Sequence, residues 1–156
     1  MKVLFADCDG VLNSERWFSE DLRLGDASLG LRSIDPVAVD MLREVLRVTG
    51  AMPVLTSLWR LSDVCVQTLR NAGLPITETT PLLRGDANRG EEIAAWLEAH
   101  PEVTCFAIVD DDPAAGDCGL RSRLVLTRWE TGLQPEHCRQ LIRLLGVAES
   151  ATLTEA

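Results

Sequence analysis

Two short apolar runs of this chain end in closely spaced aspartates. Residues 2 to 7 (KVLFAD) lead into Asp9 and Gly10, and residues 103 to 109 (VTCFAIV) lead into Asp110 to Asp112. Apolar runs without polar alternation are typical of strands in a parallel sheet that is covered on both faces. The sequence therefore predicts buried strands whose carboxyl ends carry acidic side chains.

Helical patterns alternate with strand patterns along the rest of the chain. We expect helices over residues 35–50, 62–69, 90–99 and 135–146, and further strands over residues 52–56 and 123–127, with a weak strand inside residues 75–88. The first of these helices begins at Asp35-Pro36, which supply an N-cap and a proline at the first helical position, and it ends at Gly50. This alternation predicts a three-layer, Rossmann-like α/β fold with a mainly parallel sheet and right-handed crossovers.

Length and composition limit the architecture and the location. The 156 residues suffice for one well-buried core, so we expect a single domain over residues 1–146 and a frayed tail over residues 147–156. No run approaches the roughly 18 apolar residues of a membrane span, and the first apolar run is cut too early for a signal peptide. We therefore expect a cytoplasmic protein with no membrane partner. An obligate protein partner cannot be inferred from the sequence.

Cysteine spacing and net charge exclude several classes of function. The five cysteines form an odd set without a CxxC pair, which argues against a disulfide framework and against a zinc site. The net charge of −9 argues against a broad basic surface for nucleic acid, although a local basic groove is compatible with it.

The acidic strand ends are expected to form one site. Open α/β sheets bind ligands at the carboxyl ends of their strands, and side chains two residues apart in an extended segment face the same way, so we expect Asp7 and Asp9 to face one reacting atom. Gly10 lets the chain turn away without a Cβ clash. Converging carboxylates repel one another unless a cation neutralises them, and an all-oxygen set suits Mg2+ better than zinc. The predicted metal ligands are Asp7, Asp9, Asp110 and Asp111.

Four ordered motifs resemble those of the haloacid dehalogenase-like (HAD) phosphohydrolases. DCDGVLN is similar to the first motif of that superfamily, and it is followed by Thr56 in VLTSLWR, by Arg89 before a helix and by the acidic pair in AIVDDDP. Within the superfamily, SLWR, NRGEEIAAWL, IVDDD and GLQPE resemble the small HAD domains of Swiss Army Knife RNA-repair proteins. The resemblance covers most of the chain and implies a HAD-like fold with a minimal cap.

The resemblance also implies roles for the motif residues. Asp7 would be the nucleophile that forms an aspartyl-phosphate, and Asp9 would be the general acid and base, with its backbone carbonyl on the metal. Thr56 would donate a hydrogen bond to a phosphoryl oxygen, with Ser57 as the alternative. Arg89 would stabilise phosphoryl charge and hold the nucleophile, in the place where the family usually has lysine.

Other residues have two interpretations each. Asp111 is the first choice for a direct metal ligand, and Asp110 is either a second ligand or the group that holds Arg89, with Asp112 as a substitute. The remaining phosphate-binding candidates are Gly10, Ser57 and Arg60. Arg60 is alternatively a side chain that only packs over a neighbouring tryptophan.

The predicted function is a Mg2+-dependent phosphomonoesterase. Residues 13–33 are too short for a full cap domain, so an open site would admit a nucleic-acid end or a phosphoprotein as well as a small phosphate ester. Substrate-contact candidates in that segment are Arg16, Trp17, Phe18, Arg23 and Arg32, with packing as an equal alternative for the two aromatic residues. A noncatalytic phosphate- or metal-binding module of the same fold is the alternative. A response-regulator receiver is disfavoured, because no isolated aspartate follows the middle strands.

Overall fold

A five-stranded, entirely parallel sheet forms the centre of the molecule. The computed structural model describes residues 1–23 and 34–148, and its strands follow the order β3-β2-β1-β4-β5. The strands are β1 (Lys2–Ala6), β2 (Met52–Leu55), β3 (Glu78–Thr79), β4 (Cys105–Asp110) and β5 (Leu124–Leu126). The predicted α/β fold with a mainly parallel sheet is confirmed. The strand order reverses between β1 and β4, the place where an open sheet of this type binds its ligand.

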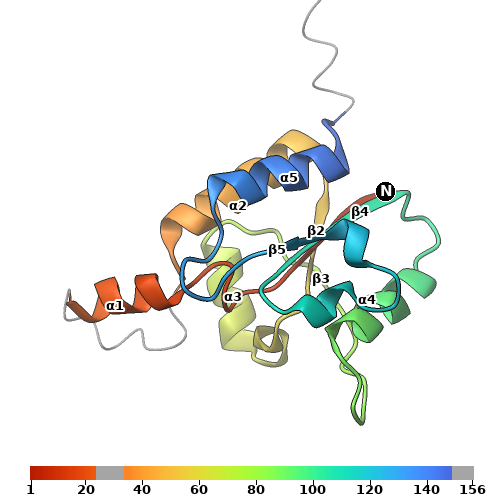
Figure 1. Ribbon diagram of the computed structural model, residues 1–156, viewed down its shortest axis with the longest axis horizontal. Coiled ribbons are helices and arrows are strands. Elements are labelled where there is room, and N and C mark those ends of the chain that lie inside the picture. The colour runs from red at the N-terminus through yellow and green to blue at the C-terminus, as the bar shows by residue number, and fades with distance from the viewer. Residues whose placement is uncertain (24–33, 149–156) are drawn as a thin grey trace, which may run out of the picture.

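Helices cover both faces of the sheet, giving three layers. They are α1 (Glu15–Arg23), α2 (Pro36–Thr49), α3 (Asp63–Asn71), α4 (Arg89–Glu98) and α5 (Pro135–Leu145). Short 3₁₀ turns span Leu58–Leu61, Pro113–Gly116 and Arg121–Arg123. Helices α2 and α5 lie side by side over one face, and α4 lies on the opposite side (Figure 1).

Alternating residues of β1 supply the two halves of the core. Leu4 and Ala6 pack into the larger cluster with residues of α2, α3 and α5, whereas Val3 and Phe5 pack into the smaller cluster with α4. Phe5 makes an edge-to-face contact with Trp96 of α4, with ring centroids 5.4 Å apart. This division follows from right-handed crossovers: the chain moves outward from β1 through β2 to β3 and then crosses back to β4, so α4 must lie on the other face.

Helix α2 begins and ends where the sequence predicts. The Asp35 carboxylate accepts a hydrogen bond from the Val37 backbone N–H at 2.9 Å, and Pro36 occupies the first turn. Gly50 ends the helix in the left-handed region at a φ of 70°, where a Cβ would be strained. Local capping chemistry alone therefore determines both ends of this helix.

Helix α1 is absent from the sequence prediction, which treats residues 13–33 as a polar segment. The Ser14 hydroxyl accepts a hydrogen bond from the Trp17 backbone N–H at 3.0 Å, an N-cap contact that could have signalled the helix. The helix has only nine residues, and its first turn is held by distant backbone: the Glu15 N–H donates to the Trp129 carbonyl at 2.9 Å. Such a contact cannot be read from local pattern. Arg32 and the side chain of Arg23 lie outside the described residues.

The end of α5 leads into two residues that are fixed to the rest of the fold. Lys2 Nζ donates to the Val147 carbonyl at 3.1 Å, and the Ala148 N–H donates to the Val48 carbonyl at 2.9 Å. Part of the predicted frayed tail is thus hydrogen-bonded to β1 and α2, and residues 149–156 lie outside the described residues. None of the described helices combines the length and apolar character needed to cross a membrane.

Candidate active site

Backbone hydrogen bonds align the loops at the carboxyl edge of the sheet. The Asp7 N–H donates to the Val109 carbonyl at 3.1 Å, and the Thr56 N–H donates to the Ala6 carbonyl at 3.0 Å. These bonds continue the parallel ladders by one residue beyond the strands. The first residues after β1 and β2, together with the last residue of β4, are therefore held at one height.

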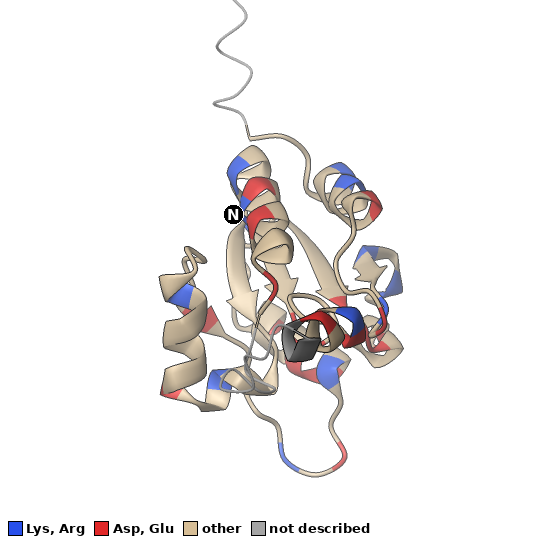
Figure 2. Ribbon diagram, turned by 90° about the vertical axis from the view of Figure 1, so that its left-hand side faces the viewer, with Lys and Arg blue, Asp and Glu red and all other residues tan. Residues whose placement is uncertain are grey.

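Three carboxylates converge at this edge. Asp7, Asp110 and Asp111 each offer an oxygen that lies within 4.8 Å of the oxygens of the other two. Asp7 and Asp110 are buried, at 5% and 0% exposure. The strands themselves carry few charged residues, which lie mainly on the surrounding helices, turns and strand ends (Figure 2). The convergence of sequence-distant aspartates is as expected, and the all-oxygen donor set fits a hard divalent cation such as Mg2+.

The crowding of these groups changes their protonation. Burial and the neighbouring Asp7 charge raise the pKa of Asp110 to about 8, because together they outweigh the stabilising effect of Arg89. Burial and Asp7 likewise raise the pKa of Asp111 to about 6. Opposite charge lowers carboxyl pKa values, so a divalent cation among these oxygens would hold them ionised at neutral pH.

Arg89 holds the carboxylates from the first turn of α4. Its Nη1 donates to Asp7 Oδ1 at 3.0 Å, to Thr56 Oγ1 at 3.1 Å and to Asp110 Oδ2 at 3.3 Å. Burial of the guanidinium lowers the pKa of Arg89, but Asp7 and Asp110 outweigh burial and raise it above its ordinary value. All three contacts use one nitrogen, so its two N–H groups are shared among the three oxygen acceptors.

The start of α4 is fixed by its own capping contacts. Asn88 forms a capping box with Glu91, and its side-chain amide also donates to Asp117 at 2.7 Å. Gly90 lies so close to the turn after β4 that a Cβ there would be 2.6 Å from the Ala114 carbonyl oxygen. These contacts place the backbone of Arg89 against the segment that carries Asp110.

Asp9 lies apart from the carboxylate cluster. Its Oδ1 accepts hydrogen bonds from Asn13 Nδ2 at 2.8 Å and from Trp59 Nε1 at 3.3 Å. The Asn13 amide oxygen in turn accepts from the Gly10 N–H at 3.0 Å. The side chain of Asp9 is therefore held by neutral donors instead of sharing the carboxylate cluster, while the predicted metal contact of its backbone carbonyl stays a prediction.

Comparison with known families assigns this arrangement to a class. A family model described as "HAD domain in Swiss Army Knife RNA repair proteins" matches residues 3–138, from β1 into α5. The chain belongs to this family of HAD domains. Neither the curated proteins nor the solved structures include a match to the sequence.

In this HAD domain, Gly10 makes room for a carboxylate. Its φ is +80°, and a Cβ at this residue would lie 2.1 Å from Asp111 Oδ2. Its carbonyl accepts a hydrogen bond from Thr127 Oγ1 at 2.6 Å, which links the loop after β1 to the segment after β5. Any side chain at Gly10 would therefore displace Asp111 as well as strain the backbone. Its predicted contact with phosphate stays a prediction.

The loop after β2 separates the roles of its two hydroxyl residues. Thr56 directs its hydroxyl oxygen toward Arg89 and so faces the site, whereas the Ser57 hydroxyl accepts from the Trp59 N–H at 3.2 Å and caps the following 3₁₀ turn. Of the two residues considered for the phosphoryl contact, Thr56 is the one that the HAD domain brings against the carboxylate cluster.

Arg60 does not face the site, contrary to its prediction as a phosphate contact. Its five N–H donors bond to the carbonyls of Thr56, Ser57, Thr80 and Pro81 and to the Glu92 carboxylate. The Arg60–Glu92 pair is 2.9 Å apart, and the Arg60 side chain is only 2% exposed. No donor is left for a phosphate, so Arg60 supports the loop after β2 and joins it to α4.

Other site residues were missed or were assigned alternatives. Asp112 accepts from the Ala114 N–H at 2.9 Å and caps the Pro113–Gly116 turn, and it is not one of the three clustered carboxylates. Sequence reasoning gave no role to Asn13 or Glu92. Asn13 is buried, but it stands at the start of the segment that the sequence prediction treats as polar, where one more polar residue gives no signal.

Proposed function

We propose that this HAD domain is a Mg2+-dependent phosphomonoesterase that works through Asp7. The observation that carries the proposal is that two aspartates separated by one residue have different surroundings. Asp7 lies in the carboxylate cluster and contacts Arg89, whereas Asp9 is held outside the cluster by Asn13 and Trp59. A nucleophile and a separate proton donor need such different surroundings.

The reaction follows in two steps from these two residues. A carboxylate oxygen of Asp7 forms a bond to phosphorus as the bond from phosphorus to the ester oxygen breaks, and Asp9 gives its proton to the leaving oxygen. Water then attacks the aspartyl-phosphate, Asp9 takes a proton from it, and inorganic phosphate and the free Asp7 carboxylate result. One carboxylate thus forms the covalent bond while the other moves protons.

The remaining residues position charge around the phosphoryl group. The Arg89 guanidinium lies 3.0 Å from Asp7, where it can offset the negative charge of the phosphoryl oxygens. Thr56 accepts a hydrogen bond from Arg89 and keeps its own hydroxyl proton for a phosphoryl oxygen. Asp7, Asp110 and Asp111 would hold Mg2+, which would supply positive charge to offset that of the phosphoryl oxygens when bound.

Both nucleic-acid ends and small phosphate esters are compatible with this proposal. The family description names RNA-repair proteins, which favours a phosphorylated nucleic-acid end for this chain too. Residues 13–33 are too few for a full cap domain, so we expect an open site that admits a bulky substrate. We therefore place nucleic-acid ends ahead of small phosphate esters.

A hydrolysis assay with controlled metal tests the proposal. Oligonucleotides with 2′-, 3′- or 5′-phosphates, sugar phosphates and phosphopeptides would be supplied to the chelator-treated protein, and released phosphate measured before and after Mg2+ is added. We expect release only with Mg2+ and fastest from oligonucleotide ends. Binding of Mg2+ or phosphate without turnover of any substrate would favour the noncatalytic module instead.

A further inference from the structure

An exposed tryptophan lies on a tight turn beside the site. Trp129 is 40% exposed, and the turn that carries it is closed by a bridge between Arg128 and Gly132, whose N–H donates to the Arg128 carbonyl at 2.7 Å. A large aromatic side chain on a short closed turn loses little conformational freedom when it binds a ligand.

Helix α1 supports this tryptophan from the side. The ring centroids of Phe18 and Trp129 are 5.9 Å apart, with the planes tilted by 41°. The Glu15 and Arg16 backbone N–H groups donate to the carbonyls of Trp129 and Glu130, at 2.9 and 3.2 Å. We refer to Phe18 and Trp129 as the aromatic platform, because α1 and the turn hold the two rings together.

The aromatic platform is joined to the loop that carries Asp9. Thr127, two residues before Trp129, donates to the Gly10 carbonyl at 2.6 Å, and the Leu133 N–H donates to the Val11 carbonyl at 2.9 Å. Two residues of chain span at most about 7 Å. The backbone of Trp129 is therefore close to the loop after β1, which also carries Asp9, the residue that we propose to serve the leaving group.

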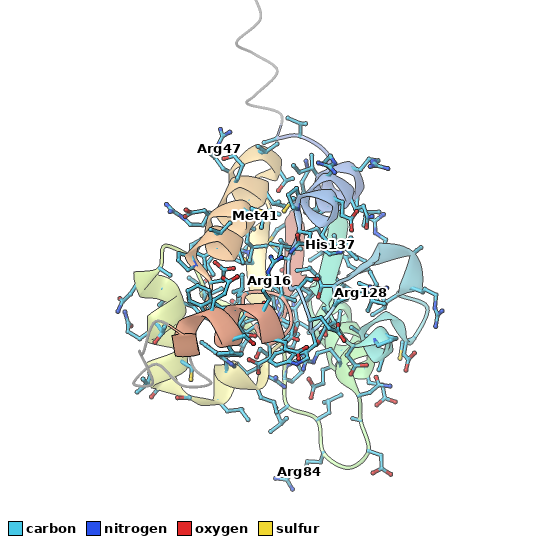
Figure 3. The ribbon with its side chains drawn as sticks, turned by 60° about the vertical axis from the view of Figure 1, so that its left-hand side comes forward. Arg16, Met41, Arg47, Arg84, Arg128 and His137 are labelled. Carbon is cyan, nitrogen blue, oxygen red and sulfur yellow. The ribbon has the colours of Figure 1, made fainter. Side chains whose placement is uncertain are left out.

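Two arginines flank the aromatic platform. Arg16 and Arg128 are exposed, and Figure 3 shows them on the neighbouring elements α1 and the turn after β5. Glu15 and Glu130 are also exposed there, so the surface is not uniformly basic. Charge of this kind suits contact with one or two backbone phosphates and does not suit a long nucleic-acid tract.

We propose that the aromatic platform stacks the base of the terminal nucleotide of a single-stranded nucleic acid whose phosphate lies at Asp7. Arg16 and Arg128 contact the adjoining backbone phosphates. Exposed aromatic rings combined with arginines are the usual means of holding single strands, since every base offers a ring face. This inference rests on the proposed function, because it takes the leaving group to lie beside Asp9.

The ratio of two hydrolysis rates tests the base contact. Oligoribonucleotides with a terminal phosphate are compared with matched oligomers whose last nucleotide lacks its base, and kcat/KM is measured for each. Trp129→Ala should lower the ratio of base-bearing to base-free kcat/KM at least about fivefold, because stacking on an aromatic ring contributes this much per base. Trp129→Phe should retain most of the ratio, and Arg47→Gln, at the far end of α2 (Figure 3), should leave it unchanged. An unchanged ratio in Trp129→Ala would show a merely structural tryptophan and overturn the inference.

A binding assay separates this inference from the catalytic proposal. In the Asp7→Asn protein, a base-bearing oligomer should quench tryptophan fluorescence, and adding Trp129→Phe should remove most of the quenching. Quenching through Trp129, together with a parent protein that releases phosphate from no substrate, would retain the aromatic platform and refute the phosphatase. Turnover without any quenching through Trp129 would retain the phosphatase and refute base stacking on the aromatic platform. The two rings would then serve another contact, such as one with a protein surface.

Discussion

The carboxylate cluster and the surroundings of Asp9 differ sharply although Asp7 and Asp9 are separated by one residue. In the cluster, Asp7 meets two other acids and the guanidinium of Arg89. The Asp9 carboxylate instead accepts hydrogen bonds from the neutral donors of Asn13 and Trp59. The spacing Asp-x-Asp thus lets one short loop supply two carboxyl groups to two different environments, whereas the adjacent Asp110 and Asp111 both enter the cluster.

The largest effect is expected at Asp7. Asp7→Asn keeps the shape of the side chain but removes the nucleophile, so turnover should fall by roughly a thousandfold or more with every substrate. Phosphate release measured with both p-nitrophenyl phosphate and an alkyl phosphate checks this, and circular dichroism verifies the fold. Near-normal rates in the folded variant would refute the assignment of the nucleophile.

Asp9→Asn should produce a loss that depends on the leaving group. General acid catalysis contributes about 10² to 10⁴ in rate, and a poor leaving group needs it most. Alkyl phosphates should therefore lose far more activity than p-nitrophenyl phosphate, whose leaving oxygen departs without a proton. The comparison uses kcat/KM, which reports the first step alone, and equal losses of kcat/KM on both substrates would mean that Asp9 does not act as the proton donor.

The cluster should make stability depend on pH and Mg2+. Burial and Asp7 raise the pKa of Asp110 to about 8 and that of Asp111 to about 6, so the metal-free folded chain binds more protons than the unfolded chain. Its free energy of unfolding should therefore fall as the pH rises from about 4 to about 8. Mg2+ should reverse this fall at pH 8, as measured by thermal unfolding at several pH values.

Asp111→Asn provides the control for that experiment. Removing one charge from the cluster should raise the Tm of the metal-free protein at pH 8 by about a few degrees and reduce the shift caused by Mg2+. Asp86→Asn, in the exposed loop before α4, should change neither quantity. If Asp111→Asn and the parent gained equal stability from Mg2+, Asp111 would not be a ligand.

A smaller effect is expected at Trp59. Trp59→Phe keeps a buried ring but removes the Nε1–H that lies 3.3 Å from Asp9, so turnover of alkyl phosphates should fall about 3- to 30-fold, the effect of losing one positioning hydrogen bond. Hydrolysis of p-nitrophenyl phosphate should change less. A parallel loss on both substrates would assign Trp59 a packing role only.

The sequence predicted best the residues that lie at the ends of strands and helices. The aspartates after β1 and at the end of β4 were predictable, because apolar runs mark the strands and a parallel sheet brings their carboxyl ends together. The caps of α2 were predictable from Asp35, Pro36 and Gly50 for a similar reason. These features depend on local chemistry or on topology alone.

Contacts between distant side chains could not be predicted in the same way. The sequence leaves Arg60 open between a phosphate contact and an arginine packed over Trp59, and only the fold shows that its donors are all used within the protein. Trp59 reaches Asp9 across 50 residues of chain, and α1 depends on backbone more than a hundred residues away. Such pairings follow from the folded arrangement and leave no periodic trace in the sequence.

The buried ion pair of Arg60 and Glu92 limits where substitutions can alter the substrate selectivity of this domain. It joins the loop of Thr56 to the helix of Arg89, so these two walls of the site form one mechanical unit. A substitution that shifts the loop or the helix should disturb the other as well, unless a second substitution compensates. New substrate selectivity should therefore arise on the opposite side, where α1 meets the turn after β5, and libraries aimed at altered specificity are best confined there.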